Sequence, residues 1–197
     1  MIIAVGAHSR NVGKTSIICS ILRAVPEARW TAVKVSGNRR GVSDGFDCIE
    51  ELEPRADSDS ARYLEAGAER AFWMRAEDRR VEEAAWRIRR LASDGANVIV
   101  ESNRIVEHLP PTLYLLALDF SVSDFKESAR RYFGRADAYC VSRSGLDTPA
   151  WGSLGPRPRE IELRPIYEIA PPDYRPRGLI RDIRTRLGLR LDRAGVA

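Results

Sequence analysis

The chain has 197 residues, of which 44% are apolar and 30% are charged, a composition typical of a globular protein rather than of a long disordered one. Of the 32 basic residues 29 are arginine, and the formal net charge is only +4, which argues against nucleic acid as a partner. No apolar run reaches the roughly 18–20 residues that cross a bilayer, and the first residues lack a basic leader. We therefore expect a cytoplasmic protein with no membrane partner.

Apolar runs of strand length alternate with longer stretches of helical period along the chain. The pattern predicts strands at 2–6, 30–35, 71–75, 97–101, 113–118 and 137–142, and helices at 14–24, 58–67, 79–93, 122–133 and 177–188. This alternation is typical of βαβ units, and strands that are apolar throughout are covered by helices on both faces. We expect an α/β fold with a mostly parallel sheet, in a single domain over residues 1–197.

Ser121 or Ser123 is the expected N-cap of the fourth helix, and Gly188 is the expected C-cap of the last one. Residues 36–58 and 143–176 are rich in glycine, proline or charge, and we expect them to be long loops, which are usually functional or mobile. The excess positive charge lies in residues 151–197, with ten basic against six acidic residues. An acidic protein or an anionic small molecule suits such a segment.

Three cysteines and three of the tryptophans have simple structural interpretations. Cys19 and Cys140 are expected to be small buried side chains, and Cys48 either binds a metal or is inert. Trp30, Trp73 and Trp86 are expected to lie in the core, because they fall on predicted strands or on an apolar helix face.

The strongest functional signal is the run GAHSRNVGKT at residues 6–15, which joins the first strand to the first helix. Gly13 lets the backbone approach a phosphate closely, and the helix N-terminus adds partial positive charge. Lys14 reaches the β- and γ-phosphates, and the Thr15 hydroxyl is a ligand for Mg²⁺. We expect contacts to a nucleoside triphosphate from His8, Ser9, Arg10, Asn11, Val12, Gly13, Lys14, Thr15 and Ser16.

One residue departs from the usual spacing G-x-x-x-x-G-K-[ST], which requires glycine at position 8. The chain has His8 there. Two interpretations stay open: His8 lies beside the γ-phosphate, or it is only a polar residue of the turn.

Carboxylates at the ends of other elements are candidates for the rest of the site. Glu101 ends an apolar predicted strand and is a candidate to hold Mg²⁺. Asp59 either caps the helix at 58–67 or touches the metal shell or a substrate. With Lys14 in a catalytic role, Asp47 and Asp59 are the candidates for activating water or an acceptor.

The run Asp59-Ser60-x-Arg62, followed by Glu65-Ala66-Gly67-Ala68 and a strand, resembles the signature of the molybdopterin-guanine dinucleotide biosynthesis protein B (MobB) family. The order of elements over residues 1–105 is also similar. The resemblance implies the three-layer sandwich of P-loop NTPases and a GTP-binding accessory role in molybdenum-cofactor biosynthesis. After residue 105 the chain resembles the dethiobiotin-synthetase/Mrp-like branch, in which Ser142 and Arg143 occupy the place of base-reading residues.

Three functions stay open. The first is an accessory protein that binds Mg²⁺ with ATP or GTP and hydrolyses the nucleotide slowly at best. The second is a small-molecule kinase or ATP-dependent synthetase, in which residues 36–58 cover an acceptor. The third is a partner-binding module that the nucleotide regulates. Related P-loop proteins often dimerise, so a homodimer is a further expectation.

Overall fold

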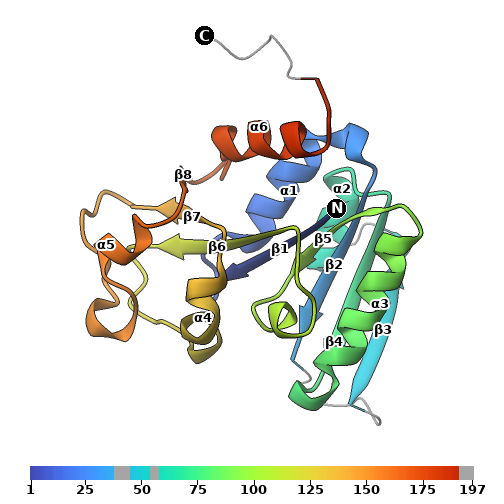
Figure 1. The fold of residues 1–197 in the computed structure, drawn as a ribbon, viewed down its shortest axis with the longest axis horizontal. Coiled ribbons are helices and arrows are strands. Elements are labelled where there is room, and N and C mark those ends of the chain that lie inside the picture. Colours follow the sequence, from blue (N-terminus) through green and yellow to red (C-terminus); the bar gives the residue numbers. More distant parts are fainter. Residues whose placement is uncertain (38–44, 54–57, 191–197) are drawn as a thin grey trace.

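The structure is a computed structural model that describes residues 1–37, 45–53 and 58–190. Its strands are β1 (Ile2–Ala7), β2 (Trp30–Ser36), β3 (Phe46–Glu51), β4 (Arg70–Ala76), β5 (Asn97–Glu101), β6 (Leu113–Asp119), β7 (Ala138–Ser142) and β8 (Ile166–Glu168). Its α-helices are α1 (Lys14–Ala24), α2 (Asp59–Glu65), α3 (Val81–Ser93), α4 (Glu127–Tyr132), α5 (Pro158–Ile161) and α6 (Arg177–Arg186). Figure 1 shows the helices on both sides of one twisted sheet.

The sheet has eight strands in the order β3-β4-β2-β5-β1-β6-β7-β8. Strand β3 runs antiparallel to β4, and the other neighbouring strands are parallel. Strand β1 lies between β5 and β6, so the turn after β1 opens at the carboxyl edge of the sheet. Crevices at this edge are where open α/β sheets bind ligands.

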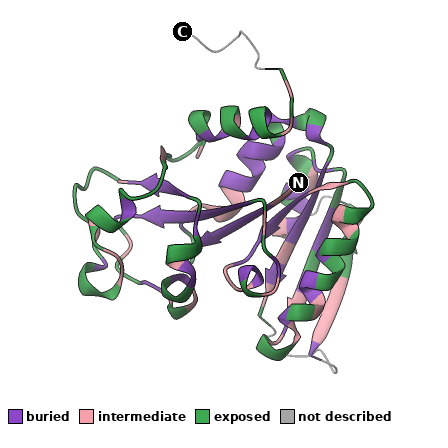
Figure 2. Ribbon diagram, viewed as in Figure 1, coloured by how far each residue is buried: buried purple, intermediate pink, exposed green. Residues whose placement is uncertain are grey.

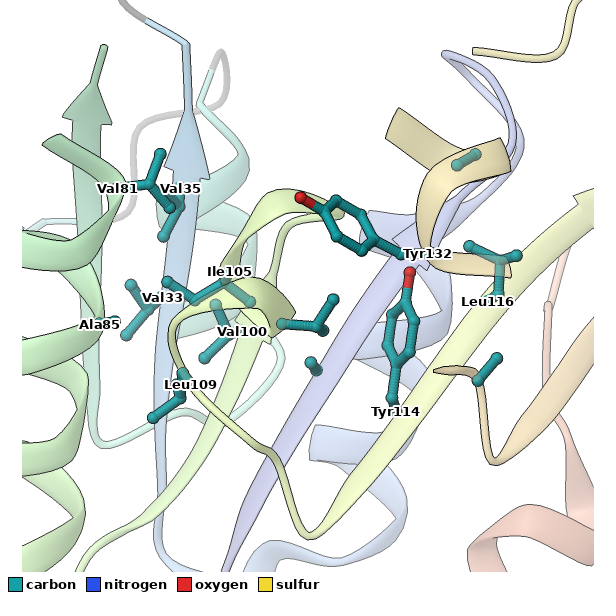
Figure 3. Close-up of a cluster of buried hydrophobic side chains, with 14 of the residues drawn as sticks. Val33, Val35, Val81, Ala85, Val100, Ile105, Leu109, Tyr114, Leu116 and Tyr132 are labelled. Carbon is teal, nitrogen blue, oxygen red and sulfur yellow. The ribbon is translucent and has the colours of Figure 1, made fainter. Parts of the chain in front are cut away.

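Alternate residues of each central strand pack on opposite faces of the sheet. One face carries Val33, Val35 and Val100 against Val81 and Ala85 of α3, and Figure 3 shows these side chains meeting. The same face is covered by η3 (Arg104–Glu107) and α4. The opposite face packs against α1, α2 and α6. Both faces of the central strands are therefore buried, as Figure 2 shows in purple.

The predicted α/β fold is confirmed, and its strands and helices lie near their expected positions. Two strands were not predicted, because β3 lies inside the expected loop 36–58 and β8 inside the expected loop 143–176. The other parts of the first loop, 38–44 and 54–57, lie outside the described residues.

Helix ends agree with the sequence at α6 but not at α4. Gly188 follows the C-cap Leu187 and has φ 67, and the N–H of Leu189 donates to the carbonyl of Arg184 at 2.9 Å, so a left-handed glycine ends α6. The N-cap of α4 is Lys126, not Ser121 or Ser123. Ser121 instead donates through its N–H and hydroxyl to Asp119, so residues before Lys126 form a loop.

The tryptophan prediction is correct for one residue of three. Trp30 is fully buried, but Trp73 and Trp86 are exposed by 36% and 51%. Cys19 and Cys140 are buried, as expected, and Cys48 is half-buried. None of the helices in the described part of the chain has the length and apolar character that crossing a bilayer requires.

Candidate nucleotide-binding site

The turn between β1 and α1 has the backbone that a phosphate-binding loop requires. Asn11 and Gly13 adopt left-handed conformations, with φ 57 and φ 90, and Gly13 is the N-cap of α1. A Cβ atom on Gly13 would also lie 2.4 Å from the Tyr174 ring. Both the conformation and this close approach therefore require glycine at position 13.

His8 anchors the turn rather than lining its cavity. Its side chain is fully buried. Nδ1 donates to the carbonyl of Asp124 at 2.8 Å, and Nε2 accepts from the N–H of Asp119 at 3.1 Å. The imidazole also packs against Phe125 and Trp151. The ring thus bridges the turn to the end of β6, and His8 is not among the residues that line the cleft. These contacts favour the interpretation of His8 as a residue of the turn, and its contact with a γ-phosphate stays a prediction.

Other contacts tie the same turn to the loop before α4. The Ser9 hydroxyl donates to the Asp124 carboxylate at 2.7 Å, and the N–H of Lys126 donates to the carbonyl of His8 at 2.8 Å. Val12 is fully buried. The side chains of Ser9 and Val12 thus support the loop, which leaves backbone groups as their means of contacting a phosphate.

Lys14, Thr15 and Glu101 come together at the start of α1. The Thr15 hydroxyl donates to Glu101 Oε2 at 2.8 Å, and Lys14 Nζ lies 4.0 Å from Glu101 Oε1. Tyr63 of α2 donates to the same Oε2 at 2.5 Å. Burial and the neighbouring Glu101 raise the pKa of Tyr63 well above its usual value, so its hydroxyl stays protonated and orients the carboxylate. Tyr63 was not predicted, because no sequence motif distinguishes it from the other residues of α2.

Asp59 is the first residue of α2 and lies beside β2, the strand next to β5 in the sheet. It forms an ion pair with Lys34 of β2, and its other oxygen lies 3.6 Å from Arg62. Asp59 is not the N-cap of α2, since Ser58 accepts the N–H of Ala61 at 3.0 Å in that role. Asp59 is therefore free of the capping role and points to Lys34.

These residues line one open cleft of about 1210 Å³. Its described lining is Arg10, Asn11, Gly13, Lys14, Thr15, Ser16, Lys34, Val35, Ser36, Gly37, Asp59, Arg62, Trp73, Arg75, Glu101, Lys126 and Tyr174. Burial lowers the pKa of Lys14, although Glu101 opposes the change. Burial, followed by repulsion from Lys14 and Arg10, lowers the pKa of Lys126 to about 8. Lys126 was not predicted, because it lies outside any sequence motif.

Asp47, Ser142 and Arg143 lie elsewhere. Asp47 forms an ion pair with Arg75 across the β3–β4 pair and is not among the residues that line the cleft. Ser142 and Arg143 line a second pocket, of about 590 Å³, together with Glu168 of β8. Tyr174 lines the first cleft and its neighbours Asp173 and Arg175 line the second, so the two pockets are adjacent.

The oxygen donors at the start of α1 fit Mg²⁺. Thr15 and Glu101 are hard ligands 2.8 Å apart, and Mg²⁺ in phosphate sites takes only one or two protein oxygens, with phosphate and water completing its shell. Within the described residues there is no group of three or more histidine, cysteine or acidic side chains that could hold a metal by itself.

Comparisons with known proteins support the α/β fold. No protein-family model matches the sequence, and no curated protein is significantly similar to it. A chain in the structure of the MinC:MinD cell division protein complex of Aquifex aeolicus is 17% identical, with a TM-score of 0.52 over 98% of this chain and 99% of that chain. MinD of Aquifex aeolicus alone is 12% identical, with a TM-score of 0.52 over 97% and 98%.

A third structure, LpxK from Aquifex aeolicus in complex with ATP, is 16% identical over 97% of this chain and 69% of that chain. Its TM-score of 0.49 is too low to support an argument. The chain therefore has an α/β fold like that of the P-loop NTPases, with a mostly parallel eight-stranded sheet.

Proposed function

We propose that the cleft binds a nucleoside triphosphate with Mg²⁺ and that the chain hydrolyses it slowly at best. One observation carries the proposal. Lys14, Thr15 and Glu101 converge on the N-terminus of α1, where the backbone already adopts a left-handed phosphate-binding turn. The N–H groups of the turn and Lys14 would neutralise the β- and γ-phosphates.

Mg²⁺, when bound, would offset charge on the phosphates and orient them. Thr15 and Glu101 are the residues that would hold it. Tyr63 fixes the orientation of Glu101 by donating to Oε2, which leaves Oε1 toward Lys14. Lys126 adds a cation from the loop before α4. Slow hydrolysis agrees with these contacts. Apart from Glu101, Asp59 is the carboxylate in the described lining that could accept a proton from water, and it is already paired with Lys34.

A titration with fluorescent ATP and GTP analogues in the presence of Mg²⁺ tests the proposal and shows whether the site prefers adenine or guanine. Lys14→Ala removes a charge-assisted contact worth about 2–3 kcal/mol, so we expect affinity to fall by roughly 30- to 150-fold. Arg23→Ala, at the exposed far end of the same helix, is the matched control and should bind as the wild type does. If neither nucleotide binds the wild type, the partner-binding module becomes the leading function.

A second candidate is phosphoryl transfer to a small molecule, and the extent of the cleft favours it. The lining continues past Glu101 to Lys34, Trp73 and Arg75 on β2 and β4. An acceptor hydroxyl there would form a bond to the γ-phosphorus while the bond to the bridging oxygen breaks, and the nucleoside diphosphate leaves with the electron pair. Asp59 would accept the hydroxyl proton. A burst of nucleoside diphosphate that depends on the acceptor would distinguish this function from slow hydrolysis.

The accessory role in molybdenum-cofactor biosynthesis rests on the resemblance of the Asp59–Ala68 run to the MobB family. The contacts of Asp59 with Lys34 and Arg62 are consistent with a site there. Binding of ATP in preference to GTP would count against this role.

A further inference from the structure

The half of the cleft that lies away from the phosphate turn is built from the ends of β2 and β4 and the start of α2. We call it the distal subsite and define it by Lys34, Ser36, Asp59, Arg62, Trp73 and Arg75, all of which line the same cleft as Lys14. Phe72 and Met74 of β4 are buried under α3. The alternation of the strand therefore places Trp73 and Arg75 on the other face, beside α2.

The charges of the cleft exceed what one nucleotide needs. Among the described residues that line it, six are cationic (Arg10, Lys14, Lys34, Arg62, Arg75 and Lys126) and two are carboxylates, Asp59 and Glu101. A nucleoside triphosphate bound with one Mg²⁺ carries about two net negative charges. The distal subsite holds three of these cations and one of the carboxylates, and Asp47, just outside the lining, pairs with Arg75. One net positive charge therefore remains there, and it favours a second anionic ligand.

Arg75 supplies a donor that the described residues do not use. Its terminal nitrogen pairs with Asp47, but its Nε is buried and has no hydrogen-bond partner within the described part of the chain. A buried donor without a partner costs free energy. The Arg75 side chain as a whole is 28% exposed, so its guanidinium can contact an anionic oxygen in the cleft, and Arg62, which is 44% exposed, lines the same subsite.

Trp73 gives the distal subsite an apolar surface among these charges. Its side chain is 36% exposed, and its indole N–H donates to Ser36 at 2.8 Å, which fixes the orientation of the ring. The Arg75 guanidinium lies 5.1 Å from the ring centroid. Because the guanidinium lies over the ring of this fixed, partly exposed indole, the two groups form a flat surface on which another ring can stack.

We propose that the distal subsite binds an anionic small molecule that carries an aromatic or heteroaromatic ring. The ring stacks on Trp73, and the anionic group is bound by Arg75 and Arg62. The proposal deepens the proposed function and rests on it in one respect: Lys14 and its turn hold the nucleotide, so the second ligand binds beside the nucleotide and not in its place.

The probe for this subsite is 1-naphthyl phosphate, titrated calorimetrically with and without the saturating β,γ-imido nucleotide. Inorganic phosphate and 1-naphthol are compared with it, because they have the charge without the ring and the ring without the charge. We expect 1-naphthyl phosphate to bind at least about tenfold more tightly than either one, since it uses both kinds of contact.

A matched pair of side chains provides the control. Trp86 and Arg90 of α3 also place a guanidinium 5.1 Å from an indole centroid, but on the opposite face of the sheet. Trp73→Leu, Arg75→Gln and Arg62→Gln should each weaken the naphthyl phosphate by about tenfold or more. They should leave the nucleotide affinity within about twofold of the wild type. Trp86→Leu and Arg90→Gln should change neither, and thermal unfolding checks that each variant is folded.

Lys14→Ala separates this proposal from the proposed function. Retained binding of naphthyl phosphate in this variant supports the distal subsite, even if no nucleotide binds the wild type. Loss of the probe in Lys14→Ala, or its displacement by the imido nucleotide, would show that the probe occupies the phosphate turn, which overturns the proposal. Equal effects of the Trp73 and Trp86 variants, or absence of binding to the wild type, would also overturn it.

Discussion

Lys126 brings a titratable charge into the cleft at the pH of ordinary assays. Its pKa is lowered to about 8, first by burial and then by the nearby Lys14 and Arg10. The side chain is therefore cationic at pH 7 and mostly neutral at pH 9. A phosphate ligand prefers the cationic form, so the affinity for nucleotide should fall as the pH rises through about 8.

The expected size of this effect is a loss of up to about tenfold in nucleotide affinity between pH 7 and pH 9. Lys126→Arg keeps the charge throughout this range, and its titration curve should be flatter than that of the wild type. Because Lys14 is unchanged in both proteins, the difference between the two curves isolates Lys126. Parallel curves in fluorescence titrations at the two pH values would show that Lys126 does not contact the nucleotide.

His8 predicts a different dependence on pH, in stability rather than binding. Burial lowers its pKa below 6.5 in the folded protein, and its Nε2 must stay unprotonated to accept from Asp119. Below pH 6.5 the unfolded chain binds a proton that the folded protein excludes. The free energy of unfolding should therefore decrease as the pH falls from about 6.5 toward the lowered pKa.

His8→Gln removes this titration, and urea unfolding at pH 7 and pH 5 measures it. The variant should be less stable than the wild type at pH 7, because the bridge between β1 and β6 is altered. However, its further loss between pH 7 and pH 5 should be smaller. An identical loss in both proteins would mean that other groups cause the acid sensitivity.

At the scale of elements, α6 is attached to the main body through a small number of buried contacts. Leu179 and Ile183 are fully buried in the cluster that includes α1, and Arg184 pairs with Glu27 at 2.9 Å, just after α1. The helix thus packs over the helix that starts at the phosphate turn.

Ile183→Ala should lower the free energy of unfolding by about 2–5 kcal/mol, the range for a large-to-small change in a packed core. Thr185→Ala, exposed on the same helix, is the control and should stay within about 0.5 kcal/mol of the wild type. Chemical denaturation measures both. A small loss for Ile183→Ala would indicate that α6 unfolds before the rest of the domain.

The elements that sequence patterns predicted are those buried on both faces of the sheet. Central strands such as β1 and β6 are nearly continuous apolar runs, so their positions were clear. Strand β3 is an edge strand with Asp47, Glu50 and Glu51, and its residues are half-buried or exposed. Strand β8 has three residues at the other edge. Neither has a hydrophobic pattern, because neither is covered on two faces.

The same reasoning explains which site residues could be predicted. Lys14, Thr15 and Glu101 follow from local sequence, because the first two open a helix and the third ends an apolar strand. Lys126 and Tyr63 reach the site only through the packing of separate elements. Trp73 was assigned to the core because it falls on a predicted strand, yet β4 lies next to the edge strand of the sheet and Trp73 is 36% exposed.

At the scale of the whole molecule, the net charge of +4 understates the local field at the cleft. The described lining holds six cations against two carboxylates, so positive charge is concentrated where the strands end. Such focusing raises the rate at which anionic ligands arrive, and the rate falls as salt is added. The composition alone could not show this, because the acidic residues lie elsewhere on the surface.

The central position of β1 also determines when the site can form during synthesis. Ile2 pairs with Val98 of β5, and Ile3 pairs with Leu113 of β6. Strand β1 is therefore synthesised before both of its partners, which are encoded far downstream, and such distant pairings are slow to close. Tyr174, which lies against Gly13, emerges later still. A nascent chain halted before residue 113 would contain β1 to β5 and the phosphate-loop sequence, but not β6, whose Ala117 carbonyl accepts the N–H of His8 in that turn.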